Sequence, residues 1–197
     1  MNISRHIKTV GFTVVELLIT LVIIAILVSI VIVSYGTYQE RTRDAERKSD
    51  MQQLATALKT NLTWNGDFIE SGSNCGSGGN GEGWTSLSSA EVTTYVNSIE
   101  QCLIDRGLLD AGEATDPTGC KRNSGGICGG NPTRAYMKMH CTVNGVKRAY
   151  VMASLETMPA NNAALDSLCT TASGCTVGCT TATWGTSYGM NYYIEVS

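Results

Sequence analysis

The sequence has few of the side chains that enzymes most often use for catalysis. Its only two histidines are His6, close to the start of the chain, and His140, in a segment whose pattern predicts a strand. It contains no G-x-S-x-G motif and no glycine-rich phosphate-binding motif. We therefore expect no enzyme activity, no catalytic residue and no cofactor.

The sequence also lacks an excess of basic residues. Fourteen Lys and Arg stand against 17 Asp and Glu, which gives a formal net charge of −3. Proteins that bind nucleic acid usually carry a basic patch or stripe. We expect no nucleic acid as the main partner.

The most informative stretch is an apolar run from Gly11 to Val33, in which Glu16 is the single charged residue. At about 1.5 Å per residue, a helix of this length could cross a bilayer core. The short segment before it holds Arg5 and Lys8 and no acid, which favours a cytoplasmic amino terminus. No A-x-A-like cleavage site follows Val33, so we expect the helix to be retained. A carboxylate in hydrocarbon is costly, and Glu16 should have a specific partner.

Gly11, Phe12 and Glu16, at the head of an apolar helix behind a basic leader, resemble the processing motif of type IV prepilins and pseudopilins. The resemblance implies that residues 1–11 are a leader, which a membrane prepilin peptidase removes by cutting between Gly11 and Phe12. It also implies N-methylation of Phe12, and contact in the filament between Glu16 and the terminal amine of a neighbouring subunit. An ammonium and a carboxylate enter an apolar medium more cheaply together than apart.

The same resemblance implies a structural subunit of a type IV pilus, a helical homo-oligomer for adhesion or twitching motility. The prepilin would span the inner (cytoplasmic) membrane once, in contact with lipid, and an inner-membrane assembly platform would build it into an extracellular filament. Two alternatives stay open: a pseudopilin of a type II secretion or DNA-uptake system, and a single-span anchored surface protein that does not polymerise. The motif carries no information about a surface or host-cell ligand.

We expect an α+β, pilin-like fold, in which residues 12–38 form the transmembrane or filament-core half of one long helix. Residues 39–197 would be an extracellular domain. Residues 39–61 contain no proline or glycine, so the helix should continue to about residue 62. The charged residues from Arg43 to Asp50 are expected either on a solvated face or between filament subunits. Apolar residues recur at helical spacing and predict the face that packs on the domain: Ala45, Met51, Leu54, Ala55, Leu58 and Leu62.

Residues 70–132 are predicted to form a variable loop region. The glycine-rich stretch 70–83 predicts an exposed loop that is attached at Cys75. A helix is expected at 89–106, because Ser88-Ser89-Ala90-Glu91 resembles a capping box and Gly107 ends the apolar spacing.

Residues 133–197 should carry an antiparallel sheet of three or more strands that covers the long helix. The strands are expected at 133–142, 147–155 and 189–196, with a short helix at 159–168. Asn144-Gly145 predicts a two-residue hairpin turn that pairs Cys141 with Arg148 and Met139 with Tyr150.

Eight cysteines in a translocated, loop-rich domain indicate disulfides. The last three lie so close together that at least one local bond is expected among them. Their spacing is not that of a zinc ribbon, and adjacent His140 and Cys141 would point to opposite faces of a strand. No acid lies between Asp116 and Glu156 in the sequence, which disfavours calcium, so we expect no metal site. The disulfide candidates are Cys75, Cys102, Cys120, Cys128, Cys141, Cys169, Cys175 and Cys179.

Overall fold

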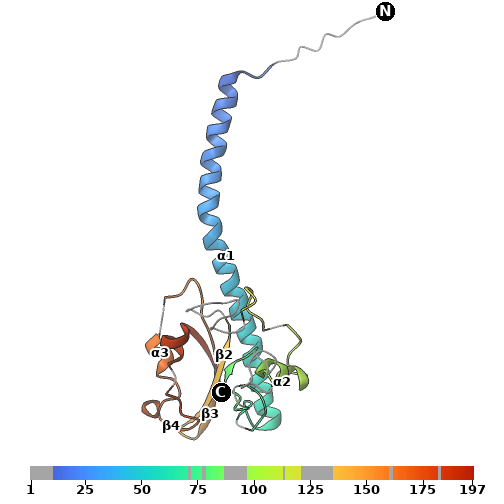
Figure 1. Ribbon diagram of the computed structural model, residues 1–197, viewed down its shortest axis with the longest axis vertical. Helices are drawn as coiled ribbons and strands as arrows, with labels where there is room; N and C mark the ends of the chain where they lie inside the picture. Colours follow the sequence, from blue (N-terminus) through green and yellow to red (C-terminus); the bar gives the residue numbers. More distant parts are fainter. Residues whose placement is uncertain are drawn as a thin grey trace, which may run out of the picture. The chain divides into compact units, whose positions relative to one another are not determined.

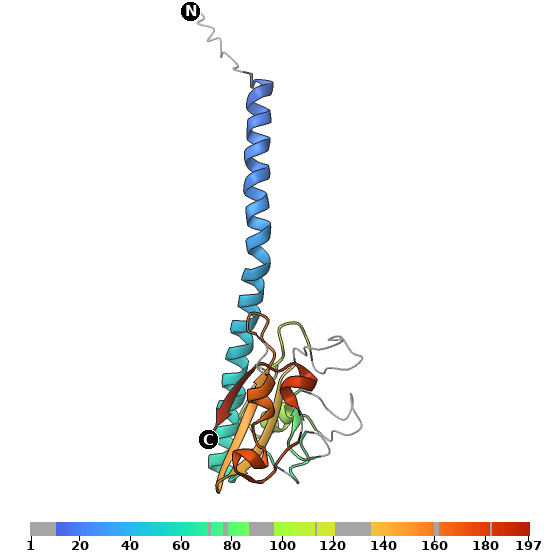
Figure 2. The ribbon, with the colours of Figure 1, turned by 90° about the vertical axis from the view of Figure 1, so that its left-hand side faces the viewer.

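The computed structural model describes residues 11–70, 72–76, 79–86, 97–112, 114–120, 135–159, 162–181 and 183–197 (Figures 1 and 2). The chain divides into two compact units, Met1–Glu40 and Arg41–Ser197. Helix α1, Val14–Asn65, begins in the first unit and ends in the second. Helix α1 ends slightly beyond the predicted residue 62. Its latter half contains no proline or glycine that would end it earlier.

The second unit contains one antiparallel sheet of five strands, which confirms the predicted α+β class. The order is β1-β2-β3-β5, and β4 pairs with β2 beside β1. The strands are β1 Gly83–Trp84, β2 Met137–Val143, β3 Val146–Ala153, β4 Cys175–Val177 and β5 Tyr192–Val196.

The hairpin between β2 and β3 confirms the predicted turn and its register. Asn144 and Gly145 have φ of 50° and 80°, the positive values that a two-residue turn of this kind needs. Cys141 pairs with Arg148, and Met139 pairs with Tyr150. Because side chains alternate along a strand, this register decides which residues of both strands face each side of the sheet.

Within the second unit, the sheet is covered on both faces. On one side, Ala149, Val151 and Ala153 share a core with Met51, Leu54 and Leu58 of α1. On the other side, the alternate residues of β2 and β3 pack on the carboxyl-terminal region. That region includes α3, Asn162–Asp166, and α4, Trp184–Tyr188. Figure 1 shows α3 on one side of β2 and β3, with α2 on the other.

The predicted helix at 89–106 begins later than its sequence signal suggested. Helix α2 is Ile99–Asp105, and the side chain of Ser98 accepts a hydrogen bond from the Gln101 amide at 2.9 Å. Ser98 is therefore the N-cap, and the prediction that one helix extends through residues 97 and 98 is wrong. Residues 87–96, which include Ser88-Ser89-Ala90-Glu91, lie outside the described residues. Gly107 follows α2 with φ of 68°, as expected for a helix end.

The glycine-rich stretch 70–83 is only in part the exposed loop that was predicted, because among its described residues Gly72, Asn74 and Asn80 are exposed and others are not. Cys75, Gly76, Gly79, Gly81 and Gly83 are all buried. A Cβ added to Gly81 would lie 1.7 Å from the carbonyl oxygen of Ile69. Glycine allows this close backbone packing as well as solvent-exposed turns, so a glycine-rich composition alone does not separate the two.

The other predicted elements differ at their ends. Residues 133 and 134 of the first predicted strand lie outside the described residues, and β2 begins at Met137. The last strand begins at Tyr192 and not at Gly189, because Gly189 has φ of 71° and ends α4. The short helix expected at 159–168 is α3, whose neighbours 160 and 161 are not among the described residues.

Candidate functional site

Thr13 and Glu16 form a reciprocal cap at the head of α1. The Thr13 amide and hydroxyl both donate to Oε2 of Glu16 at 2.9 Å, and the Glu16 amide donates to the Thr13 hydroxyl oxygen at 3.2 Å. Glu16 was predicted to have a specific partner, and within this chain the partner is Thr13. Thr13-Val14-Val15-Glu16 matches the capping-box pattern, so the sequence carries a local signal for this contact.

The predicted cleavage junction lies just before this cap. Gly11, Phe12 and Thr13 precede the first helical residue, and the Phe12 side chain is 81% exposed. A Cβ added to Gly11 would have no atom within 4 Å. The described structure leaves this bond open to a protease that binds extended backbone.

The apolar part of α1 has no apolar partner in the described part of the chain. Its large side chains between Val14 and Ile32 are all about half exposed or more, from 48% at Val28 to 75% at Val14. Soluble proteins rarely expose a continuous apolar surface of this extent. Among the described residues, α1 is the one helix long and apolar enough to cross a membrane. The segment requires an apolar environment that lies outside the described chain.

The polar side chains inside this run are bonded locally. The Thr20 hydroxyl donates to the carbonyl of Leu17 at 2.9 Å, and the Ser29 hydroxyl donates to that of Ile26 at 2.7 Å. Such bonds lower the cost of placing a hydroxyl in hydrocarbon. Glu16 is the single acidic or basic residue of α1 before Gly36.

A second site is a cluster of buried charges where α1 lies in the second unit. Arg47 is completely buried and donates to three carboxylates: Asp116 at 2.6 Å, Glu156 at 2.7 Å and Asp44 at 2.9 Å. Arg43 donates to both oxygens of Glu156, at 2.7 and 2.6 Å. Planar, bidentate arginine–carboxylate contacts of this kind are among the stronger charge-assisted hydrogen bonds.

Asp44 fixes the segment that follows β3. Its carboxylate accepts hydrogen bonds from the amides of Glu156 and Thr157, each at 2.8 Å, and from the Thr157 hydroxyl at 2.7 Å. Burial works against the charged carboxylate, but these donors and Arg47 lower the pKa of Asp44 below its ordinary value. Burial likewise opposes the charge on Arg47, yet Asp116 and Glu156 raise the pKa of its guanidinium. Asp44 and Arg47 are therefore both stabilised in their charged forms.

This cluster corrects the interpretation of the charged stretch from Arg43 to Asp50. Asp44, Arg47 and Asp50 are buried inside the chain, so these three residues lie neither on a solvated face nor between subunits. Ala45, predicted on the packed face, is exposed. The buried face of α1 is apolar after Asp50 and charged from Asp44 to Asp50. Arg47 on this face binds Asp116 and Glu156, which lie far away in the sequence. Helical spacing alone could not reveal them.

Asp116 illustrates the same point. The sequence has no acid between Asp116 and Glu156, but in space Asp116 shares Arg47 with Asp44 and Glu156. The carboxylates converge on a guanidinium. Among the described residues, no group of three or more His, Cys, Asp or Glu side chains could hold a metal ion. Asp116–Gly119 forms a turn, in which the Gly119 amide donates to the Asp116 carbonyl at 2.7 Å.

Lys138 and His140 form a third buried polar group, on β2. The Lys138 ammonium donates to the carbonyls of Ile69 at 2.8 Å and Gly81 at 2.7 Å, and lies 3.3 Å from Nδ1 of His140. Burial lowers the pKa of Lys138 to about 7. Burial and the nearby ammonium lower the pKa of His140 to about 3, so its ring is neutral. The group attaches the 69–81 stretch to β2.

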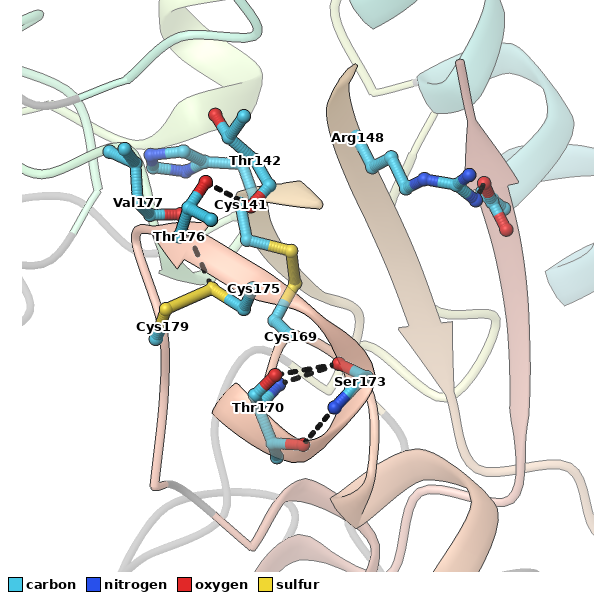
Figure 3. Close-up of a disulfide and its surroundings, with 12 residues drawn as sticks. Cys141, Thr142, Arg148, Cys169, Thr170, Ser173, Cys175, Thr176, Val177 and Cys179 are labelled. Carbon is cyan, nitrogen blue, oxygen red and sulfur yellow. Dashed lines mark hydrogen bonds and ion pairs between the residues drawn. A yellow bond between two sulfur atoms is a disulfide. The ribbon is translucent and has the colours of Figure 1, made fainter. Parts of the chain in front are cut away.

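Three disulfides lie within the described residues: Cys75–Cys102, Cys141–Cys169 and Cys175–Cys179. The last confirms the predicted local bond, and Figure 3 shows it beside Cys141–Cys169. Cys120 is also disulfide-bonded, and Cys128 lies outside the described residues. His140 and Cys141 face opposite sides of β2, as predicted, because Cys141 belongs to the core on the α3 side while His140 contacts Lys138.

Comparison of the chain with protein-family models, with curated proteins and with solved structures finds no match.

Proposed function

We propose that this chain is a structural subunit of a type IV pilus, made as a prepilin and cleaved between Gly11 and Phe12. Phe12, with a methylated amine, would begin the mature subunit. The proposal rests on the motif Gly11, Phe12 and Glu16 and on the structure around it. Phe12 is exposed, and the apolar helix α1 begins two residues after it, at Val14.

The exposed apolar part of α1 is the observation that carries the proposal. An apolar helix that the described chain does not cover must lie in lipid or against other apolar helices. A pilin uses both environments in turn, the inner membrane before assembly and the packed helices of an extracellular filament afterwards. A single-span anchored protein uses only the first.

The cap at the head of α1 fits the proposed assembly contact. Both donors of Thr13 bind Oε2 of Glu16, so neither of them occupies Oε1. We propose that Oε1 receives the terminal amine of Phe12 from a neighbouring subunit. Pairing this amine with the carboxylate reduces the cost of bringing each charge into the apolar filament core.

Shearing cells that express the protein tests this function, with mass spectrometry of the released filaments. The expected result is filaments whose subunit begins at N-methylated Phe12. Gly11→Val should leave the leader attached, and no filament should be released. Because a side chain at Gly11 would meet no atom within 4 Å, this variant should fold normally.

The same measurement separates the alternatives. An anchored surface protein would start at Met1, or at Phe12 without appearing in the sheared fraction. A pseudopilin would be processed at Phe12 but would be absent from the sheared fraction at ordinary expression levels. Long filaments at ordinary expression levels support the pilus subunit.

A further inference from the structure

Three Asn-Gly pairs lie in the described chain: Asn65-Gly66, Asn80-Gly81 and Asn144-Gly145. In such a pair, the backbone nitrogen of the glycine can attack the side-chain amide carbon of the asparagine, because glycine has no side chain to hinder the approach. The attacking nitrogen must lose its proton and move toward that carbon. A hydrogen bond from this N–H to another group opposes both events.

Asn65-Gly66 is held at the end of α1. The Gly66 amide donates to the carbonyl of Leu62 at 2.9 Å. The side-chain amide of Asn65 donates to Oδ1 of Asn61 at 2.7 Å. Both reacting groups are therefore fixed by hydrogen bonds.

Asn80-Gly81 is held even more closely. The Gly81 amide donates to the carbonyl of Cys75 at 2.7 Å, and the Gly81 carbonyl accepts from the buried ammonium of Lys138 at 2.7 Å. Gly81 itself is buried against the backbone of Ile69. The attacking nitrogen cannot move without opening this packed segment.

Asn144-Gly145 differs from both, although its sequence chemistry is the same. The two residues are exposed at the tip of the hairpin. Within the described chain, the Gly145 amide donates no hydrogen bond, and a Cβ at Gly145 would have no atom within 4 Å. The attacking nitrogen is open to solvent and to base.

We propose that Asn144 is a site of spontaneous deamidation in the folded protein. The Gly145 nitrogen forms a bond to Cγ of Asn144, the bond from Cγ to the side-chain nitrogen breaks, and ammonia leaves with the proton. The resulting cyclic imide takes up one water and opens to aspartate or isoaspartate. The reaction consumes water, releases ammonia and requires no oxidant, reductant or enzyme.

The modification would loosen the attachment of β4. The backbone amide of Asn144 donates to the carbonyl of Gly174 at 3.2 Å. A Cβ at Gly174 would lie 2.9 Å from the side-chain Oδ1 of Asn144. Isoaspartate adds one carbon to the backbone of this tight turn, and either product adds a negative charge. The nearby bond from the Thr176 hydroxyl to the Thr142 carbonyl, at 3.2 Å, should weaken with it.

The test is to incubate the folded, full-length protein in mildly alkaline buffer and to follow all three pairs by peptide mapping with fragmentation. Conversion replaces the asparagine side-chain amide with a carboxyl group, so each converted peptide is heavier than its unconverted form. We expect Asn144 to convert at least about tenfold faster than Asn65 and Asn80, the ratio that corresponds to about 1.4 kcal/mol of local opening. Asn65 and Asn80 serve as internal controls with the same reacting groups.

The reduced and denatured chain is the second control, because there the three pairs should convert at similar rates. Asn144→Gly keeps a residue that accepts positive φ and should remove the mass gain. The proposal is overturned if Asn65 or Asn80 converts as fast as Asn144 in the folded protein. It is equally overturned if Asn144 stays intact while the denatured chain converts.

Discussion

The two parts of α1 contrast in a way that hydropathy would not suggest. Between Val14 and Ile32 the apolar side chains are exposed, whereas between Asp44 and Asp50 three charged side chains are buried. The charged part is completed inside the chain, by partners such as Asp116 and Glu156. The apolar part has no such partner in the described residues. The described chain thus supplies partners for the charged part of α1 and none for the apolar part.

Removing the charge of Arg47 should lower the free energy of unfolding more than any other change proposed here. Arg47→Met would leave the carboxylates of Asp44, Asp116 and Glu156 without their shared cation. Loss of one partner of a buried ion pair costs about 3–5 kcal/mol. Denaturant unfolding of the full chain in detergent measures the change. Lys59→Met, an exposed position on α1, is the control and should stay within about 0.5 kcal/mol of the parent. An equal effect of both variants would contradict the role of the cluster.

The disulfides test how far the second unit depends on crosslinks. Cys141 and Cys169 are separated by 28 residues, and Cys175 and Cys179 by 4. In the chain-entropy model, removing the first bond costs roughly 3.5 kcal/mol and removing the second roughly 2 kcal/mol. Double replacement by alanine, followed by thermal unfolding, should reproduce that order. The reverse order would show that packing at β4 outweighs loop closure.

His140 should make the stability of the second unit depend on pH. Its folded pKa of about 3 lies below its ordinary value of 6.5. Between these values the unfolded chain binds more protons, so stability should fall as the pH decreases from 6.5 towards 3. The slope from this one group is at most about 1.4 kcal/mol per pH unit. His140→Gln should flatten the decrease between pH 6.5 and 4, as followed by thermal unfolding. An unchanged slope would show that other groups cause it.

The smallest expected effect concerns the cap of α1. Thr13→Val removes the hydroxyl that bonds both the Glu16 carboxylate and the Glu16 amide, while Thr13→Ser keeps it. Loss of such a cap costs about 1 kcal/mol of local helix stability. Hydrogen exchange of the Glu16 amide should accelerate about fivefold in the valine variant, the ratio that 1 kcal/mol implies. Equal exchange in both variants would mean that the cap does not protect this amide.

Local sequence signals predicted the elements whose causes are local. The extent of the latter half of α1 follows from the absence of proline and glycine there, and the register of β2 and β3 follows from Asn144-Gly145. The face of α1 from Met51 to Leu58 follows from helical spacing. In each case the residues that decide the structure are neighbours in the chain.

The sequence did not reveal features that depend on distant contacts. Arg47 is buried because Asp116 and Glu156 reach it, at separations of 69 and 109 residues. Gly81 is buried because Lys138, 57 residues away, binds its carbonyl. The Thr13–Glu16 cap was local and could have been found, because the capping-box pattern requires only four residues.

We propose that other copies of the same chain cover the exposed part of α1, and that Glu16 makes the contact between copies. The direct test is Glu16→Leu, measured as subunit in the membrane, processing after Gly11, and subunit in sheared filaments. A more apolar helix should insert as well as the parent, and cleavage should continue. The neighbouring Phe12 amine would lose its partner in an apolar core, which costs several kcal/mol for each subunit added. We expect normal membrane levels, a processed amino terminus and no filaments. Normal filaments from Glu16→Leu would show that Glu16 is not the assembly contact.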